Sequence, residues 1–210
     1  MTDRRRAALD HVKKHANAGD VPSILAALDD FAINHEFLMN VGPEKGPLLE
    51  ASVRDLKPGA RVLELGCFCG YSAILIGNAL PEGATLTGVE VHDKSVAVAS
   101  SIVEFAGLAD RVSIRHGSST DVIGTLRHPF DLVFLDHWKD LYKPNLLALE
   151  AGNLLVPGSV VFADNVGPHF NPEVYLEHVR TSGRYQSEYH SSHIEYRDDE
   201  DGVEISIFIG

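Results

Sequence analysis

The chain has 210 residues, of which 44% are hydrophobic and 23% charged; these proportions fit a globular domain and exclude a disordered chain, a collagen and a coiled coil. Thirty acidic side chains against eighteen basic ones give a net charge of −12, so we expect no nucleic-acid partner. Two cysteines are too few for a disulfide framework and favour a cytoplasmic location, and no apolar run is long enough to predict a membrane span.

The first 58 residues have the patterns of helices rather than strands. Residues 1–16 carry apolar side chains at helical spacing, with the basic residues near the start on a solvated face. A second helix is expected over residues 23–34, after the stop and start signals at Gly19-Asp20. Pro43 is placed to open a third helix, because a residue in the first turn needs no backbone N–H.

From residue 60 onward, short apolar runs alternate with amphipathic segments. This alternation predicts a parallel sheet that is covered by helices on both faces, with right-handed crossovers. The expected strands are residues 61–66, 85–91, 112–117, 131–136 and 159–165, and the expected helices are residues 71–80, 93–107, 120–126 and 146–155.

The C-terminal residues break this alternation. Residues 193–197 and 203–210 are expected to be strands, and the short acidic segment between them predicts an antiparallel hairpin at one edge of the sheet. A mostly parallel α/β sheet with such a hairpin looks like the Rossmann-like class I S-adenosylmethionine-dependent methyltransferase fold. We expect a single domain over residues 1–210, with helices of residues 1–58 covering the site and an α/β core over residues 60–210.

Polar and glycine residues end the first three strands, where an open α/β sheet binds its ligands. Glu64 and Gly66 end the first strand, and the glycine spacing after them differs from the dinucleotide fingerprint. A carboxylate there would repel a pyrophosphate and suits a cationic amino-acid ligand. Glu90 ends the second strand, where it could accept hydrogen bonds from a ribose. Small polar residues 116–121 follow the third strand and suit an adenine, although ordinary solvated loops would explain each feature singly.

The fourth and fifth strands deliver oxygen ligands. Asp136 ends one of them, and Asp164 and Asn165 end the other, so their side chains are expected to be neighbours. Two carboxylates and an amide oxygen are hard donors, which favours Mg²⁺ over zinc. A turn or helix cap at Asp164-Asn165 is the structural alternative.

Several motifs together identify a family resemblance. DHWKD, ADNV, VLELGCFCGYS, EFAGLADRV and IEY closely resemble the catechol O-methyltransferase family, and the resemblance covers nearly the whole chain. It implies that Lys139 is the general base and that Glu195 hydrogen-bonds the second catechol hydroxyl. It also implies three groups of binding residues. They are Asp136, Asp164 and Asn165 for Mg²⁺; Val41, Glu64, Gly66, Tyr71, Ser72, Glu90, Ser119, Asp136 and His137 for S-adenosylmethionine; and Phe37, Met39, Trp138, Lys139, Asn165 and Glu195 for the substrate.

The chain departs from its mammalian relatives around the substrate. Phe37 replaces a gate tryptophan, Thr120 replaces a glutamine near the adenine, and the segment after ADNV is one residue longer, around Pro168. The expected apolar wall, formed by Phe37, Trp138 and residues near Pro168, therefore leaves substrate range and regioselectivity open.

The sequence thus predicts a monomeric, Mg²⁺-dependent enzyme that methylates one hydroxyl of a small catechol. A related cation-dependent methyltransferase for larger vicinal diols, such as caffeoyl esters, is the alternative within enzymes. A catalytically idle S-adenosylmethionine-binding module is the alternative from another class, disfavoured because the base and metal residues are present. Cys67 and Cys69 are expected to be packing thiols, with a reactive thiol beside the cofactor loop as the other hypothesis.

Overall fold

The computed structural model describes residues 3–210, which begin with three helices. Asp3 and Asp20 cap the first two helices by accepting hydrogen bonds from Arg5 N and Ser23 N. Pro43 lies in the first turn of the third, as the sequence predicted. The helices are α1 (Arg4–His15), α2 (Val21–Asn34) and α3 (Gly42–Arg54).

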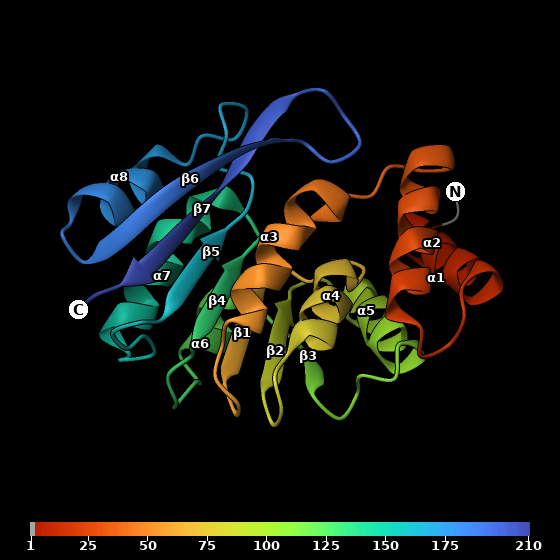
Figure 1. Ribbon diagram of the computed structural model, residues 1–210, viewed down its shortest axis with the longest axis horizontal. Helices are drawn as coiled ribbons and strands as arrows, with labels where there is room; N and C mark the ends of the chain where they lie inside the picture. Colours follow the sequence, from red (N-terminus) through yellow and green to blue (C-terminus); the bar gives the residue numbers. More distant parts are fainter. Residues whose placement is uncertain (1–2) are drawn as a thin grey trace.

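A mixed sheet forms the centre of the molecule, and its strand order is β3-β2-β1-β4-β5-β7-β6 (Figure 1). Strands β1 to β5 are parallel to one another, while β7 is antiparallel to both β5 and β6. The expected fold class, mostly parallel with a C-terminal antiparallel hairpin, is confirmed. The strands are β1 (Arg61–Leu65), β2 (Thr85–Glu90), β3 (Val112–His116), β4 (Leu132–Leu135), β5 (Val160–Ala163), β6 (Tyr185–His193) and β7 (Glu200–Phe208).

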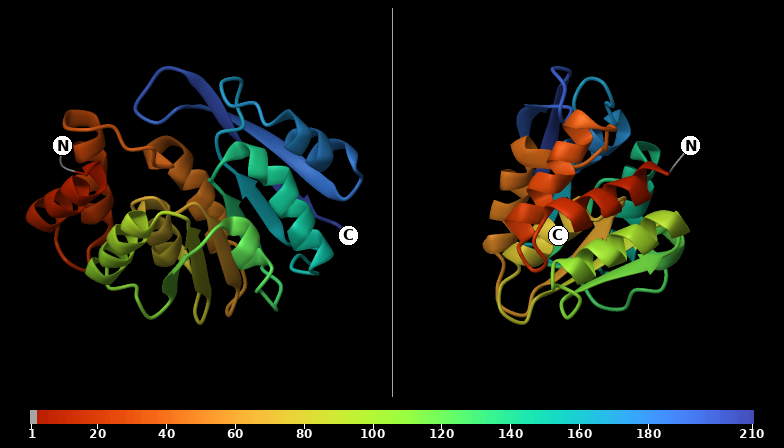
Figure 2. Two further views of the ribbon diagram at one scale, coloured as in Figure 1. Left: turned by 180° about the vertical axis from the view of Figure 1, so that it is seen from behind. Right: turned by 90° about the vertical axis from the view of Figure 1, so that its right-hand side faces the viewer.

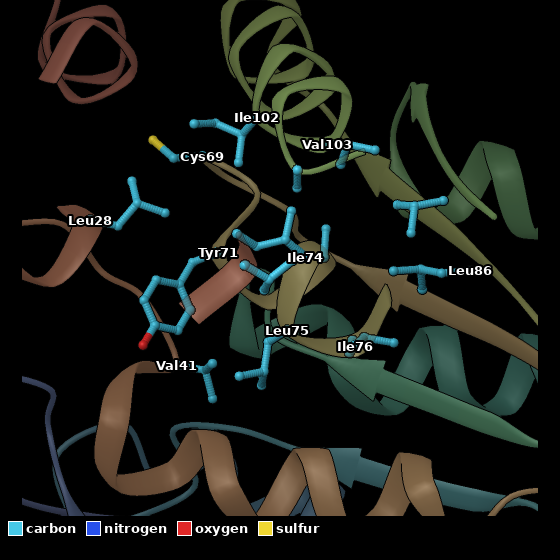
Figure 3. Close-up of a cluster of buried hydrophobic side chains, with 14 of the residues drawn as sticks. Leu28, Val41, Cys69, Tyr71, Ile74, Leu75, Ile76, Leu86, Ile102 and Val103 are labelled. Atoms are coloured by element: carbon cyan, nitrogen blue, oxygen red, sulfur yellow. The ribbon is translucent and has the colours of Figure 1, made fainter. Parts of the chain in front are cut away.

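Helices cover both faces of this sheet (Figure 2). Within the described residues, one hydrophobic cluster joins the sheet to helices α1 to α5, and a second joins its other face to α6, α7 and α8. Figure 3 shows part of the first cluster. Side chains of α4, including Tyr71 and Ile74, pack there between helices α2 and α5. The remaining helices are α4 (Tyr71–Ala79), α5 (Asp93–Phe105), α6 (Ser119–Ile123), the short 3₁₀ helix η1 (Lys139–Leu141), α7 (Tyr142–Ala151) and α8 (Glu173–Thr181).

The first strand of the C-terminal hairpin differs from the prediction. We expected residues 193–197 to be a strand, but β6 ends at His193 and the following residues form the turn. Ile194 N donates to the Asp199 carbonyl across this turn, and Tyr196 has a left-handed φ of 61°. The prediction was wrong because the preceding segment, an edge strand, is largely polar and gave no apolar signal. Helix α8 was also missed.

The switch in strand order lies at β1. Its neighbours are β2 on one side and β4 on the other, so the loops that follow β1 and β4 diverge above the sheet. Gly66 allows the chain after β1 to pass close to the chain after β4. Its φ is 97°, and a Cβ there would lie 2.3 Å from the Asp136 carbonyl oxygen. The strand ends that carry the predicted site residues therefore meet at one edge. Among residues 3–210, each helix is too short or too polar to cross a membrane.

Candidate active site

Two adjoining cavities open at the carboxyl ends of the parallel strands. The larger has a volume of about 700 Å³, and Met39, Lys139 and Phe170 are among its lining residues. The smaller, of about 270 Å³, is lined by predicted cofactor residues that include Gly66, Glu90 and Ser119. The cavities share five lining residues, which are Phe68, His92, Asp136, His137 and Trp138. A ligand in one cavity would thus approach a ligand in the other beside Asp136.

Glu64, near the end of β1, is a fully buried carboxyl group that is not among the lining residues of either cavity. Ser72 Oγ donates a hydrogen bond to Glu64 Oε1, while Oε2 has no partner in the part of the chain that the structure describes. Burial raises the pKa of Glu64 to about 8. An unpaired buried carboxylate oxygen fits a cationic ligand, because a nearby positive charge would offset its desolvation.

Glu90 is held by the backbone at the end of β2. Phe68 N donates to Glu90 Oε2 at 3.0 Å, and His92 N donates to Oε1 at 2.9 Å. Each carboxylate oxygen can accept a further hydrogen bond. The carboxylate is therefore fixed in orientation and still able to bind a pair of hydroxyls in the smaller cavity.

His137 is fixed by a residue that the sequence analysis missed. Asn145 Nδ2 lies 2.8 Å from His137 Nε2 and 2.6 Å from Ser119 Oγ, and Thr120 Oγ1 donates to Asn145 Oδ1. Because Asn145 Nδ2 can only donate, Nε2 accepts and the ring proton sits on Nδ1, which is buried without a partner among residues 3–210. Burial lowers the pKa of His137 to about 3, so the ring is neutral. Nothing in the local motif pointed to Asn145, which comes from α7.

Val41 and Tyr71 are core residues. Among the described residues, neither belongs to the lining of the two cavities. Figure 3 shows Val41 beside the Tyr71 ring. The Tyr71 hydroxyl donates to Asp29 Oδ2 on α2, and the Tyr196 hydroxyl donates to the other oxygen of Asp29. These contacts join α4 and the hairpin turn to α2. The side chain of Tyr71 therefore connects helices in this structure.

The three predicted metal ligands lie close together, with Lys139 between two of them. Lys139 Nζ donates to Asn165 Oδ1 at 2.9 Å and lies 3.4 Å from Asp136 Oδ1. It also donates to the Tyr142 hydroxyl at 2.8 Å, whose single proton has the carbonyls of Leu135 and Asp164 within hydrogen-bond distance, at 2.7 and 2.9 Å. Tyr142 therefore orients the lysine, a role that the sequence analysis did not assign.

Asp164 faces a second lysine that the sequence analysis also missed. Lys45, on α3, is fully buried, and its Nζ lies 2.5 Å from Asp164 Oδ1 and 2.9 Å from Asp201 Oδ2. These carboxylates raise the pKa of Lys45 despite its burial, so it stays charged. Lys45 lies in a polar segment and has no sequence feature that separates it from a surface lysine.

Glu195 lies in the hairpin turn and packs against the start of α3. Its Oε1 is 3.4 Å from Lys45 N, and a Cβ at Gly42 would lie 2.2 Å from its Oε2, so glycine is needed there. Burial raises the pKa of Glu195 to about 8. The turn thus brings Glu195 to Lys45, the residue that pairs with Asp164.

The aromatic wall differs in part from the expectation. Trp138 lines both cavities and is 73% exposed, and Phe170 lines the larger cavity with its ring centre 5.6 Å from Lys139 Nζ. Pro168 instead lines a separate depression against α8 and β6, because the loop turns between residues 167 and 171. Phe37 packs edge-on against Tyr196, with the Arg197 guanidinium 4.4 Å from its ring centre.

The two cysteines behave as packing residues. Cys67 and Cys69 are both buried and unbridged. Burial raises the pKa of Cys69 to about 12, and that of Cys67 well above its usual value. The thiolate is the reactive form, so the structure disfavours the hypothesis of a reactive thiol.

Comparisons with known proteins identify the family of this chain. A family model described as O-methyltransferase matches residues 15–171. Catechol O-methyltransferase B of Danio rerio is 43% identical over 99% of this chain and 80% of its own length. The chain belongs to the catechol O-methyltransferase family. The Mus musculus catechol O-methyltransferase is 41% identical over 99% of this chain and 79% of its own length. The protein is therefore an O-methyltransferase of this family.

A solved structure shows the same fold. The O-methyltransferase from Bacillus cereus, determined in complex with SAH, superposes with a TM-score of 0.73 at 24% identity, covering 96% of this chain and 90% of that chain. At this identity the likeness concerns the fold, and it agrees with the sheet order and the terminal hairpin described above.

Proposed function

We propose that this protein transfers a methyl group from S-adenosylmethionine to one hydroxyl of a small catechol in an Mg²⁺-dependent reaction. The observation that carries the proposal is the position of Lys139. Its amine contacts Asp136 and Asn165 at the wall of the larger cavity, while Asp136 also borders the smaller cavity. This position supports a role for Lys139 as proton acceptor, beside the place where a substrate and a methyl donor would meet.

The chemistry of the donor set supports the metal. Asp136, Asp164 and Asn165 would hold Mg²⁺ through hard oxygen atoms. The orientation of the Asn165 amide fits this role, because its Nδ2 donates to Asp201 and its Oδ1 therefore faces Asp136 and Lys139. When bound, Mg²⁺ would lower the pKa of a chelated catechol hydroxyl and hold the two adjacent oxygens of the substrate in place.

The smaller cavity supports the cofactor. Glu90 offers two fixed carboxylate oxygens to a ribose, and Ser119 and His137 flank the space for an adenine. Glu64 offers its unpaired oxygen to an amino group. The Bacillus cereus relative is described in complex with SAH. S-adenosylmethionine would supply the methyl group from its sulfonium.

Lys139 would accept the proton of the attacking hydroxyl at Nζ. In the structure this nitrogen has three acceptors, which suits an ammonium. Two of these acceptors are proposed metal ligands, so Lys139 would share them with a dication. Positive charge nearby favours the neutral amine, which is the form that can take up a proton. Tyr142 would keep the nitrogen in position, and Glu195 would accept a hydrogen bond from the second hydroxyl.

The proposal is tested with labelled S-adenosylmethionine and a panel of diols, with and without EDTA. Small catechols are expected to be methylated once, EDTA to abolish turnover, and added Mg²⁺ to restore it. Resorcinol is the matched control, because its two hydroxyls cannot chelate one metal ion. Caffeoyl esters test the alternative of a larger substrate.

Two results would contradict the proposal. Full turnover of catechol in EDTA would exclude the metal role. Equal rates with catechol and resorcinol would show that the adjacent oxygens are not used.

A further inference from the structure

Histidines gather where α1 packs against the C-terminal end of α2, outside both active-site cavities. His11 belongs to α1, Asp30 to α2, and His35 follows the last residue of α2. One ligand atom from each of the three lies within 4.8 Å of the others. We call this group the α1–α2 histidine cluster. The two helices lie side by side at one end of the molecule (Figures 1 and 2).

Packing holds the rings of the cluster in place. The rings of His11 and His35 lie 4.9 Å apart, and the buried Phe31 packs against both, with its ring centre 5.6 Å from that of His11 and 5.5 Å from that of His35. His15, one helical turn after His11, stacks on the His11 ring at 4.3 Å. The aromatic contacts therefore bring three imidazoles together at one seam between two helices.

The nitrogen of His11 that faces the cluster lacks a hydrogen bond. His11 Nε2 is 2.9 Å from Asp30 Oδ2, yet among residues 3–210 this buried atom has no partner in hydrogen-bond geometry. Asn34 Nδ2 donates to Asp30 Oδ1 and leaves Oδ2 turned toward the histidine. A buried acceptor beside a carboxylate oxygen is the arrangement that a cation would complete.

The side-chain types in the cluster suit a metal ion. Two imidazoles and one carboxylate each offer a ligand atom, and neutral imidazole and ionised carboxylate are the forms that bind metal ions.

We propose that His11, Asp30 and His35 form a second metal site, selective for a divalent transition metal of the Zn²⁺ class. Imidazole nitrogen prefers such ions, whereas the oxygen set at Asp136 suits Mg²⁺. Ligand atoms around Zn²⁺ lie about 3–4 Å apart, so modest rotations of these side chains would close the site. The site is independent of methyl transfer.

A metal here would join α1 to the segment that leads into α3. That segment carries Phe37 and Met39, and Arg4 Nη1 of α1 already donates to the Phe37 carbonyl at 3.2 Å. The ion would add a second connection between α1 and this border of the larger cavity. Its direct consequence is stabilisation of the folded protein by ligand binding.

Equilibrium dialysis of the untagged full chain against Zn²⁺, in millimolar Mg²⁺ to occupy the oxygen site, tests the proposal. We expect one Zn²⁺ per chain and an upward shift of the melting temperature of about 5 °C at saturation. Co²⁺ in place of Zn²⁺ should give visible absorption from nitrogen coordination.

Variants locate the site. His35→Ala and Asp30→Asn change exposed residues and should each weaken Zn²⁺ binding by at least about 10-fold, as should His11→Ala. His128→Ala removes an exposed histidine elsewhere and should leave the affinity unchanged. The proposal is overturned if no Zn²⁺ is retained, if the three variants bind like the parent protein, or if His128→Ala weakens binding equally.

Discussion

Asn165 lies between two lysines, and the two regions that it joins are built differently. Its Nδ2 donates to Asp201, which pairs with Lys45, and its Oδ1 accepts from Lys139. Lys45 is fully buried between two carboxylates, whereas Lys139 borders the larger cavity. Two lysines near one amide thus have different surroundings.

The difference suggests a division of roles. A buried lysine held by two carboxylates keeps its proton and balances their charge. A lysine at a cavity wall can meet a substrate and change its protonation state. We therefore expect Lys45 to determine stability and the placement of Asp164, and Lys139 to determine the rate. The predictions below test this division.

The largest expected effect is on the free energy of unfolding of Lys45→Met. The substitution leaves Asp164 and Asp201 buried without their cation, which costs about 3–5 kcal/mol. Urea denaturation without added metal measures it, and Lys57→Met, at an exposed lysine, is the control. If Lys45→Met does not fold, Lys45→Arg should retain much of the stability. A loss below about 1 kcal/mol would contradict the assigned role.

Lys139→Met should give the converse result. Loss of a general base lowers kcat by about 10²–10⁴, while the unfolding free energy should fall by less than it does in Lys45→Met, because Lys139 contacts one carboxylate at a cavity wall rather than two in the core. Steady-state kinetics and the same urea titration measure both quantities. The defect should shrink as the pH rises, because a catechol that has already ionised needs no base. A defect that is independent of pH would indicate a positioning role instead.

Glu64 sharpens the comparison because it is a buried carboxyl without a lysine. The pKa of Asp201, beside Lys45, is lowered, whereas burial raises that of Glu64 to about 8. A carboxyl group whose pKa is higher in the folded than in the unfolded state favours folding at low pH. This contribution is lost as the pH rises from about 4.5 to 8.

The cofactor-free protein should therefore lose about 3 kcal/mol more between pH 5 and pH 8 than Glu64→Gln does. Urea titrations across this range measure the difference. Glu82→Gln, at an exposed position, should follow the parent protein. Parallel pH profiles of parent and Glu64→Gln would show that Glu64 is ionised in the folded state.

The smallest expected effect is on the ratio of methylated products, which depends on the aromatic residues of the larger cavity. We expect a 3,4-dihydroxybenzoyl substrate to give meta and para ethers, with meta favoured. Phe170→Ala should change this ratio by up to about 10-fold, since the side chain lines the larger cavity. Phe37→Ala should change it less, because Phe37 packs against Tyr196. Chromatography of the two ethers measures the ratio, and an unchanged ratio in both variants would exclude Phe170 and Phe37 from the wall that sets regioselectivity.

The strand ends were predictable because their pattern is local. Apolar runs that end in Glu64, Glu90, Asp136 or Asp164 indicate buried parallel strands with polar termini, and a parallel sheet must bring such termini to one edge. The antiparallel pairing of the last two strands was predictable, but the residues at which the first of them begins and ends were not. The strand before Ile194 is an exposed edge with no apolar alternation, and its register is determined by pairing with β7.

The sequence by itself determined the alternation of strands and helices, the family, and the residues that end each strand, because these depend on local pattern and spacing. Only the tertiary structure decided which partners those residues meet. Lys45 reaches the site from α3, Asn145 and Tyr142 from α7, and Phe170 from the loop after β5, while His11 meets Asp30 and His35 across two helices. A side chain's neighbours across the fold depend on packing between distant segments, which no local pattern encodes.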